Sequence, residues 1–200
     1  MKIIKSILLV CCACAAVTFT SCVGNDGPTV LTKEQKAAAF QQIKGNYTGK
    51  LVYKNPTSTT ASKLDSVDVK WEMLTDSTMR INNFPTAPLV KNITNKEISA
   101  ALATLPPQAL NCMIDIRKND PLLFTVNPKP LEYNTTYEGK AHHLKILFYI
   151  NISGSFGGYI PAKKRIQIQI VVASVFVDGK PKPELIKGYI PVVLDGKREK

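Results

Sequence analysis

Cysteine is scarce in this 200-residue chain, and its positions exclude a disulfide framework. Four of the five cysteines lie at positions 11, 12, 14 and 22, and Cys112 is the only one that follows. A domain formed by the residues after position 22 therefore has no internal disulfide, and its stability must come from a packed core.

The chain also lacks the sequence motifs of common enzyme classes. It contains no His-Glu-x-x-His, no Gly-x-Ser-x-Gly, no phosphate-binding loop and no dinucleotide-binding fingerprint. Its only histidines, His142 and His143, are adjacent, and adjacent strand residues point to opposite faces, which disfavours a shared metal ion. Cys112 lies beside Met113 and Ile114 and is expected to be a small buried residue rather than a nucleophile. We therefore predict no catalytic residue, no metal ligand and no cofactor.

A hydrolase with a less obvious pair of carboxylates stays open as an alternative to a non-catalytic protein. Glycosidic bond cleavage needs two acidic side chains on facing elements, and the sequence does not show which acids face each other. The candidates are Asp68, Glu72, Asp115, Glu132 and Glu138.

The first 22 residues have the layout of a secretory signal. Lys2 and Lys5 form a basic start, an uncharged and mostly apolar run extends over residues 7–19, and two small residues precede Cys22. A membrane span needs roughly 20 apolar residues, so this run favours a cleaved signal over a retained anchor. Residues 1–21 are therefore predicted to be a signal peptide.

The four residues Phe19-Thr20-Ser21-Cys22 resemble a bacterial lipobox, which usually begins with Leu where this chain has Phe19. The resemblance implies that Cys22 is acylated and becomes the first residue of the mature protein. Stable anchoring takes more than one acyl chain, which such a cysteine normally carries. Val23 stands where enteric lipoproteins of the inner membrane have Asp, so the resemblance implies the outer membrane. The periplasmic and the cell-surface face both stay open.

The rest of the chain is predicted to be a short tether and one domain. Residues 22–31 contain the acylated cysteine and a polar segment with Gly and Pro, which is typical of a flexible tether. Residues 32–200 are long enough for a single domain with its own core. The net charge of +11 falls to +9 when Lys2 and Lys5 are removed, and the lysines are spread along the chain. In an exported protein this pattern indicates a basic surface exposed to solvent. No nucleic-acid partner is predicted, because the protein is expected outside the cytoplasm.

Two short helices are predicted from capping boxes. Thr32 and Gln35 form the first box, which predicts a helix over residues 33–44 that ends at Gly45. The segment 94–97 forms the second, with Thr94 as the expected cap, before apolar residues at helical spacing that end at Pro106.

Most of the remaining chain alternates with the period of two that is typical of strands. Residues 154–158 are predicted to be a glycine-rich turn, and Asp178-Gly179 predicts a hairpin turn. We predict a mainly β fold of about eight antiparallel strands, a barrel or a sandwich, with an α+β fold as the alternative. The predicted strands cover residues 47–53, 67–73, 79–81, 113–117, 122–126, 144–152, 166–177 and 185–194.

The opening of the domain resembles two known groups of proteins. A lipoprotein signal, a polar spacer, a short helix and then Gly45-Asn46-Tyr47 resemble small Bacteroidales lipoproteins of unknown function. The Gly45-x-Tyr47 step also resembles the opening of lipocalin-like barrels, which favour Trp where this chain has Tyr47. In addition, Asp65-Ser66-Val67 and Asp76-Ser77-Thr78 resemble the O-glycosylation triplet of the Bacteroides group, which makes Ser66 and Ser77 candidate acceptors.

The leading functional prediction is a non-catalytic, lipid-anchored envelope domain that binds a small ligand, a glycan or an envelope partner. Trp71 alternates in phase with Val69 and is expected in the core. Tyr133 and Tyr137 lie in a polar segment and are expected to be exposed, so they are predicted, together with Tyr159, to form any ligand-binding face. A structural subunit of an envelope assembly is a further alternative.

Overall fold

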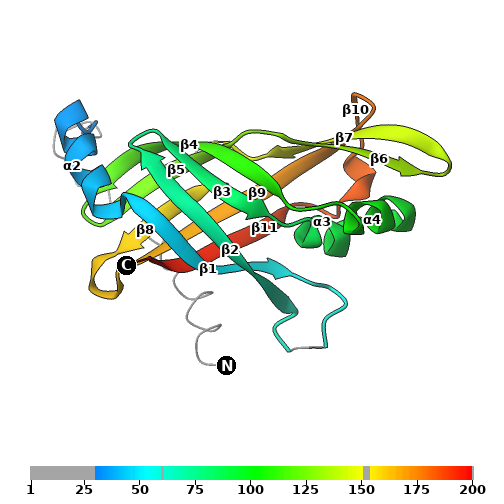
Figure 1. Ribbon diagram of the computed structural model, residues 1–200, viewed down its shortest axis with the longest axis horizontal. Coiled ribbons are helices and arrows are strands. Elements are labelled where there is room, and N and C mark those ends of the chain that lie inside the picture. Colours follow the sequence, from blue (N-terminus) through cyan, green and yellow to red (C-terminus); the bar gives the residue numbers. More distant parts are fainter. Residues whose placement is uncertain (1–29, 60, 151–153, 200) are drawn as a thin grey trace, which may run out of the picture. The chain divides into compact units, whose positions relative to one another are not determined.

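Eight antiparallel strands close into a barrel in the computed structural model, which describes residues 30–59, 61–150 and 154–199 (Figure 1). The predicted signal peptide 1–21, Cys22 and all but the last two residues of the predicted tether lie outside the described residues. The barrel order is β11-β1-β2-β3-β4-β5-β8-β9, and pairing of β9 with β11 completes the ring. The strands are β1 (Gly45–Lys54), β2 (Leu64–Thr75), β3 (Thr78–Phe84), β4 (Gln108–Asn119), β5 (Leu122–Pro128), β8 (Phe156–Ile160), β9 (Arg165–Val177) and β11 (Ile190–Arg198). The predicted mainly β fold is confirmed, as a barrel.

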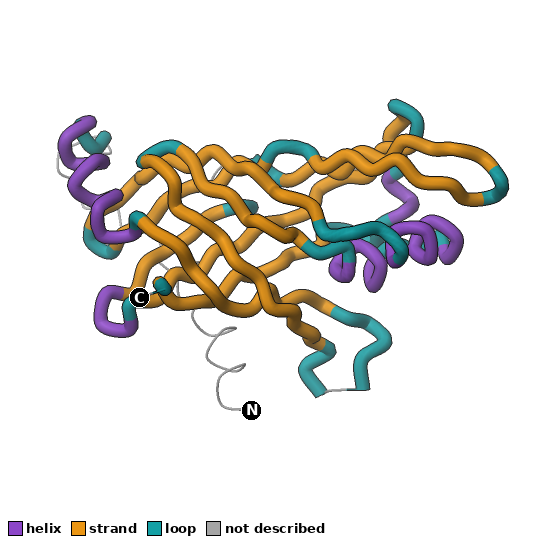
Figure 2. Tube along the Cα trace, in the orientation of Figure 1, coloured by secondary structure: helices purple, strands orange, loops and turns teal. Residues whose placement is uncertain are grey.

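Strand β9 is longer than the ring requires, and its second half supports a hairpin outside the barrel. Residues from Val172 to Val177 pair with β7 (Lys140–Phe148), which in turn pairs with β6 (Leu131–Tyr137). This β6–β7 hairpin projects beyond one end of the barrel (Figures 1 and 2). The short strand β10 (Lys180–Pro181) folds back on β9 through Asp178 and Gly179, whose positive φ angles of 50° and 77° confirm the predicted turn.

The interior of the barrel is filled by side chains, which is one of the two arrangements that eight strands allow, the other being a cavity for a small ligand. Trp71 and Tyr47 are buried and stack with their ring centroids 5.6 Å apart. Where β1 meets β11, Gly49 lies opposite Gly196, and a Cβ atom at Gly196 would lie 2.4 Å from the ring of Trp71. Because Gly49 and Gly196 have no side chains, the indole ring of Trp71 can occupy the space beside them. The core also contains Leu51, Met73, Ile81, Leu110, Ile114, Phe124, Ile168 and Leu194.

Helix α2 (Lys33–Ile43) covers the end of the barrel where β1 begins. Its predicted capping box is confirmed, because Thr32 Oγ1 accepts from the backbone of Gln35 and the Gln35 side chain accepts from the backbone of Thr32. Tyr47 Oη donates to the carbonyl of Ile43 at 2.8 Å, which ties the helix end to the first strand.

Helices α3 (Ala87–Asn92) and α4 (Lys96–Ala103) lie at the opposite end, beside the hairpin (Figure 1). Helix α3 is not among the predicted elements: Pro88 lies in its first turn, where proline is favourable, and the helix is only 6 residues long. Helix α4 begins one residue later than predicted, since Asn95 rather than Thr94 caps the backbone N–H groups. Two 3-10 turns, at Pro161–Lys163 and Pro183–Leu185, complete the described elements. None of the described helices has both the length and the apolar character of a membrane span.

Two strands depart from the predicted pattern for identifiable reasons. The predicted glycine turn over residues 154–158 is wrong, because Phe156–Ile160 form β8. A Cβ atom at Gly157 would lie 2.3 Å from the ring of Phe124, so glycine is needed there to let the ring pack against the strand. Strand β6 is also unpredicted, because its polar outer residues conceal the buried alternation of Leu131 and Tyr133.

Candidate functional site

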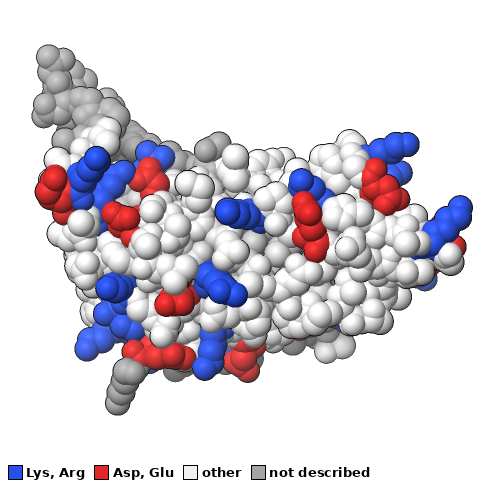
Figure 3. All heavy atoms as spheres, turned by 45° about the horizontal axis from the view of Figure 1, so that its top comes forward, with Lys and Arg blue, Asp and Glu red and all other residues white. Residues whose placement is uncertain are grey.

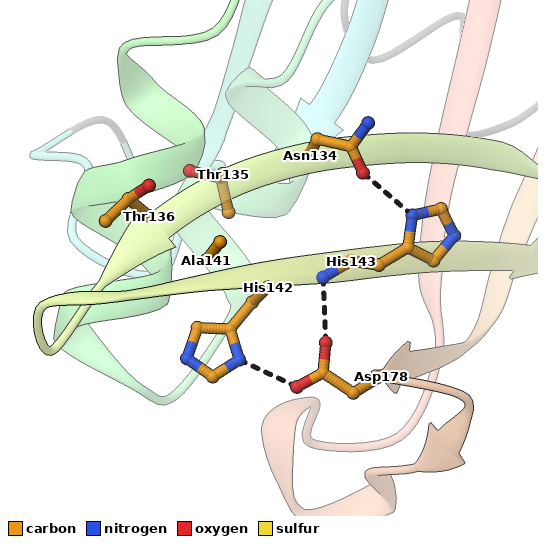
Figure 4. A pocket seen from close by; sticks show the side chains of 7 residues that line it. All are labelled: Asn134, Thr135, Thr136, Ala141, His142, His143 and Asp178. Carbon is orange, nitrogen blue, oxygen red and sulfur yellow. Dashed lines mark hydrogen bonds and ion pairs between the residues drawn. The ribbon is translucent and has the colours of Figure 1, made fainter.

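A polar hollow lies where the β6–β7 hairpin meets the turn that follows β9. Its volume is about 450 Å³, and it combines hydroxyl, amide and imidazole groups from the two strands of the hairpin with the carboxylate of Asp178, which is distant in sequence. Figure 4 shows these side chains around the two strands of the hairpin. The lining residues are Asn134, Thr135, Thr136, Ala141, His142, His143 and Asp178.

Asp178 fixes the geometry of the hollow. Its Oδ2 lies 2.8 Å from His142 Nδ1, and its Oδ1 accepts from the backbone N–H of His143 at 2.9 Å. Its own backbone N–H donates to the carbonyl of His143 at 2.8 Å. The N–H of His143, followed by the ring of His142, lowers the pKa of Asp178, so the carboxylate is charged at neutral pH.

His142 is held on the inner face of the hairpin. Its ring stacks on Tyr137 with centroids 3.9 Å apart, and 17% of its side chain is exposed. Its Nε2 atom is buried and has no hydrogen-bond partner among the described residues. The second ring nitrogen therefore does not reach a substrate in the hollow, which argues against His142 as a general base with Asp178 behind it.

His143 lies on the outer face, where it joins a strip of polar side chains. Its Nδ1 is 3.0 Å from Asn134 Oδ1, and its Nε2 is 3.7 Å from a carboxylate oxygen of Glu132. Glu132 also lies 3.3 Å from Lys145 Nζ. The two imidazoles point to opposite sides of β7 (Figure 4), as predicted from their adjacent positions.

The three predicted tyrosines do not come together. Tyr133 is 2% exposed, so the expectation that it lies on the surface is wrong, and burial raises its pKa to about 12. Tyr137 is half-buried against His142, and its pKa is raised, first by burial and then by the charges of Asp178 and Glu138. Tyr159 pairs with residue 166 at the start of β9, away from the hairpin at the other end of that strand. A ligand-binding role for these residues stays a prediction.

The other predicted positions are placed as follows. Trp71 is in the core, and Cys112 is a buried thiol whose pKa burial raises to about 12. Ser66 is exposed on β2 and Ser77 is exposed in the turn before β3, and their O-glycosylation stays a prediction. Among the described residues, no three His, Cys, Asp or Glu side chains form a group that could hold a metal ion.

Of the acids considered for hydrolysis, Glu138 meets another carboxylate. Glu138 lies in the β6–β7 turn, and Glu97 lies in the first turn of α4. A hydrogen bond with Glu138 and the repulsion between the two charges raise the pKa of Glu97. Both residues are exposed and neither lines the hollow, so the pair is not set in a cleft as acid–base catalysis requires.

We expect this pair to make the contact between α4 and the hairpin dependent on pH. A carboxyl group whose pKa is higher in the folded than in the unfolded protein stabilises the folded state at low pH. This stabilisation is lost as the pH rises through the pKa of the folded state. Glu138→Gln should return the pKa of Glu97 toward its usual value and remove the pH dependence. Carbon NMR titration of the Glu97 carboxyl measures this, and identical titration curves in both proteins would contradict it.

Sequence reasoning found the histidines but missed their partner. Asp178 was identified as part of a turn, and its separation of 35 residues from His143 hides the contact in the linear sequence. Asn134 lies in the polar run Asn134-Thr135-Thr136, where no pattern distinguishes it. The available signal was the Asp-Gly pair, since an Asp at the first position of such a turn has its carboxylate close to the neighbouring strand.

The fold and site together define a closed antiparallel β-barrel with a polar hairpin site outside it. Residues 42–177 match the family described as a domain of unknown function, DUF4840, and this match covers most of the chain. The chain therefore belongs to that family. The match extends from the end of α2 to the end of β9 and includes the hairpin. Neither the curated proteins nor the solved structures compared with this chain give a match.

Proposed function

We propose that this chain is an outer-membrane lipoprotein of the Bacteroidales type that binds a hydroxyl-rich ligand, of the glycan class, without chemical change. The observation that carries the proposal is the contrast between the filled barrel and the open hollow on the hairpin, whose lining combines polar groups with apolar surface. An eight-stranded barrel without an open interior must bind its ligand on its outside. The Gly45-x-Tyr47 opening of β1 is consistent with a lipocalin-like origin of the barrel, which belongs to the same proposal.

The chemistry of the hollow suits sugar hydroxyls, which donate and accept hydrogen bonds at once. Asp178 supplies an anionic acceptor, and Thr136, on the same face of β6 as Asn134, supplies a hydroxyl that does both. The carboxamide oxygen of Asn134 faces His143, which leaves its NH₂ group without a partner among the described residues and able to donate. These groups are held by the hairpin and by Asp178 before any ligand arrives, which reduces the entropic cost of binding.

The charged surface supports binding of a neutral or mixed-charge partner rather than a polyanion. On the face shown in Figure 3, basic and acidic side chains are interspersed without a large area of one sign. The net positive charge is therefore best explained by scattered lysines in solvent.

Binding is expected to depend on the hairpin and not on the barrel wall. On an array of purified bacterial and host glycans, the wild-type protein should bind a subset of glycans, and Asn134→Ala combined with Thr136→Val should weaken that binding at least tenfold. Thr48→Val, in a second hollow of about 270 Å³ on the barrel wall, is the matched control and should bind as the wild type does. Binding that survives the hairpin variant would overturn this proposal.

The anchor is tested separately from the ligand. Cys22→Ala should move the protein from the membrane fraction to the soluble fraction, because no acyl chain is attached. Protease treatment of intact cells, with a periplasmic control protein, then assigns the wild-type domain to the cell surface or to the periplasm. Retention of Cys22→Ala in membranes would contradict the lipid anchor.

A further inference from the structure

Strand β2 is longer than its pairing with β3, which leaves part of one edge open. Leu64 to Met73 pair with β1 without interruption. On its other side, β2 pairs with β3 only from Trp71 to Thr75. The rest of β3 pairs with β4 and not with β2, with a register shift between Ile81 and Phe84. The edge of Leu64–Lys70 that faces away from β1 therefore has no strand paired with it, although Asn83 of β3 reaches Lys70 at its end.

The backbone contacts at both ends of this segment show which groups point outward. Lys63 O accepts from the backbone N–H of Asn55, on the β1 side of the hairpin, so residues with odd numbers face β1. Lys70 N–H instead donates to Asn83 Oδ1 at 3.3 Å, on the open side. Because the direction alternates along a strand, the N–H and C=O groups of Leu64, Ser66 and Asp68 also point to the open side, where no described residue pairs with them.

This edge lacks two of the features that normally prevent strand addition, because it contains no proline and its pairing with β1 shows no bulge. Its charged residues are Asp65, Asp68 and Lys70. Ser66 and Asp68 are exposed, and the side chain of Asp68 is 85% exposed although it pairs with Lys50 at 2.7 Å. The β1–β2 hairpin also projects from the barrel, which makes the edge accessible (Figure 1).

We propose that a second copy of this chain pairs with the open edge of β2, antiparallel about a two-fold axis at Val67. In this register Ser66 of one copy lies opposite Asp68 of the other, twice, so that each hydroxyl can donate to a carboxylate. The N–H and C=O groups of Ser66 and Asp68 are thereby paired across the axis. Leu64 lies opposite Lys70, whose outward N–H already donates to Asn83, so the register depends on the two Ser66–Asp68 pairs. A two-fold axis at Asp68 would place the two Asp68 carboxylates opposite each other. An axis between two residues would place a residue whose backbone groups point outward opposite one whose backbone groups point toward β1.

The size of the edge sets the strength of the interface. Seven residues per copy bury far less than the roughly 800 Å² per partner of standard stable interfaces. The dimer is therefore weak and depends on concentration. Confinement of both copies to one membrane raises their effective concentration, which suits an interface of this size.

The test is sedimentation equilibrium of residues 22–200 with Cys22→Ala, which keep the whole compact unit from Leu31 onward. We expect a monomer–dimer equilibrium between 10 μM and 1 mM, on the order expected for so small an interface. Ser66→Lys places a cation opposite Asp68 and should tighten the dimer several-fold. Ser66→Asp places two carboxylates together and should weaken it at least tenfold, whereas Ser77→Asp, outside the edge, should leave it unchanged.

A second variant tests the backbone contacts directly. Ser66→Pro removes an N–H group that faces away from β1, so the fold should be retained while the dimer is lost. If this variant does not fold, the opposite effects of the two charge variants still decide the question. A protein that stays monomeric up to 1 mM, or a dimer that responds to none of these changes, would overturn the proposal.

Discussion

Gly157→Ala is expected to lower the free energy of unfolding by about 3 kcal/mol, the upper part of the range for overpacked cores. The new Cβ atom would lie 2.3 Å from Phe124 Cζ and 3.1 Å from Ile168 Cγ1. Phe124 is 1% exposed, so the ring and the strands around it must shift to accommodate the new methyl group. Urea denaturation followed by circular dichroism measures the change.

The next residue of the same strand provides the control. A Cβ atom at Gly158 would lie 3.2 Å from Leu123 Cδ2, the far end of a flexible side chain, so Gly158→Ala should change stability by less than about 1 kcal/mol. Both variants add the same methyl group at a glycine in β8, and they differ only in the face on which it lies. Equal effects of the two substitutions would contradict the assignment of β8 as a barrel strand with Gly157 inward.

Arg165→Met is expected to cost about 3 kcal/mol, because it leaves a buried carboxylate without its cation. Arg165 Nε and Nη2 both donate to the carboxylate of Asp195, and the pair connects β9 with β11, the two strands that close the barrel. The side chain of Asp195 is 3% exposed, whereas that of Arg165 is 24% exposed. Thermal and urea unfolding of the variant measure the loss.

The difference in exposure predicts an asymmetry between the partners. Asp195→Asn should cost less than Arg165→Met, since the guanidinium group that remains can be hydrated. The double variant Arg165→Met and Asp195→Leu should recover much of the stability, because an apolar pair removes the buried charge. A larger loss from Asp195→Asn than from Arg165→Met would show that burial of the carboxylate does not dominate this contact.

Regular alternation made most of the barrel predictable from sequence. In β2, Val69, Trp71 and Met73 are all buried, as their period of two indicates, and the capping box at Thr32 located α2 correctly. Each of these signals depends on residues that are close in the sequence. The closure of the barrel instead depends on contacts such as Gly49 with Gly196, which no local pattern shows.

The candidate site was less predictable because its parts meet only through tertiary pairing. His143 and Asp178 come together because β7 pairs with the second half of β9. Tyr133 was misplaced for the opposite reason: its neighbours are polar, but the inner face of β6 is covered by α4. The position of the Asp178 contact and the burial of Tyr133 both depend on how the β6–β7 hairpin packs. That packing depends in turn on β9, which extends past the barrel and pairs with β7.

The central claim is that the ligand binds in the hairpin hollow outside a filled barrel. Trp71 is the only tryptophan and lies in the barrel interior, so its indole N–H resonance reports directly on that interior. The most direct measurement is therefore a nitrogen–proton NMR titration with the glycan that the array identifies. The account predicts shifts at Asn134 and His143 with the Trp71 resonance unchanged. A shift of the Trp71 indole, with the hairpin resonances unaffected, would contradict it.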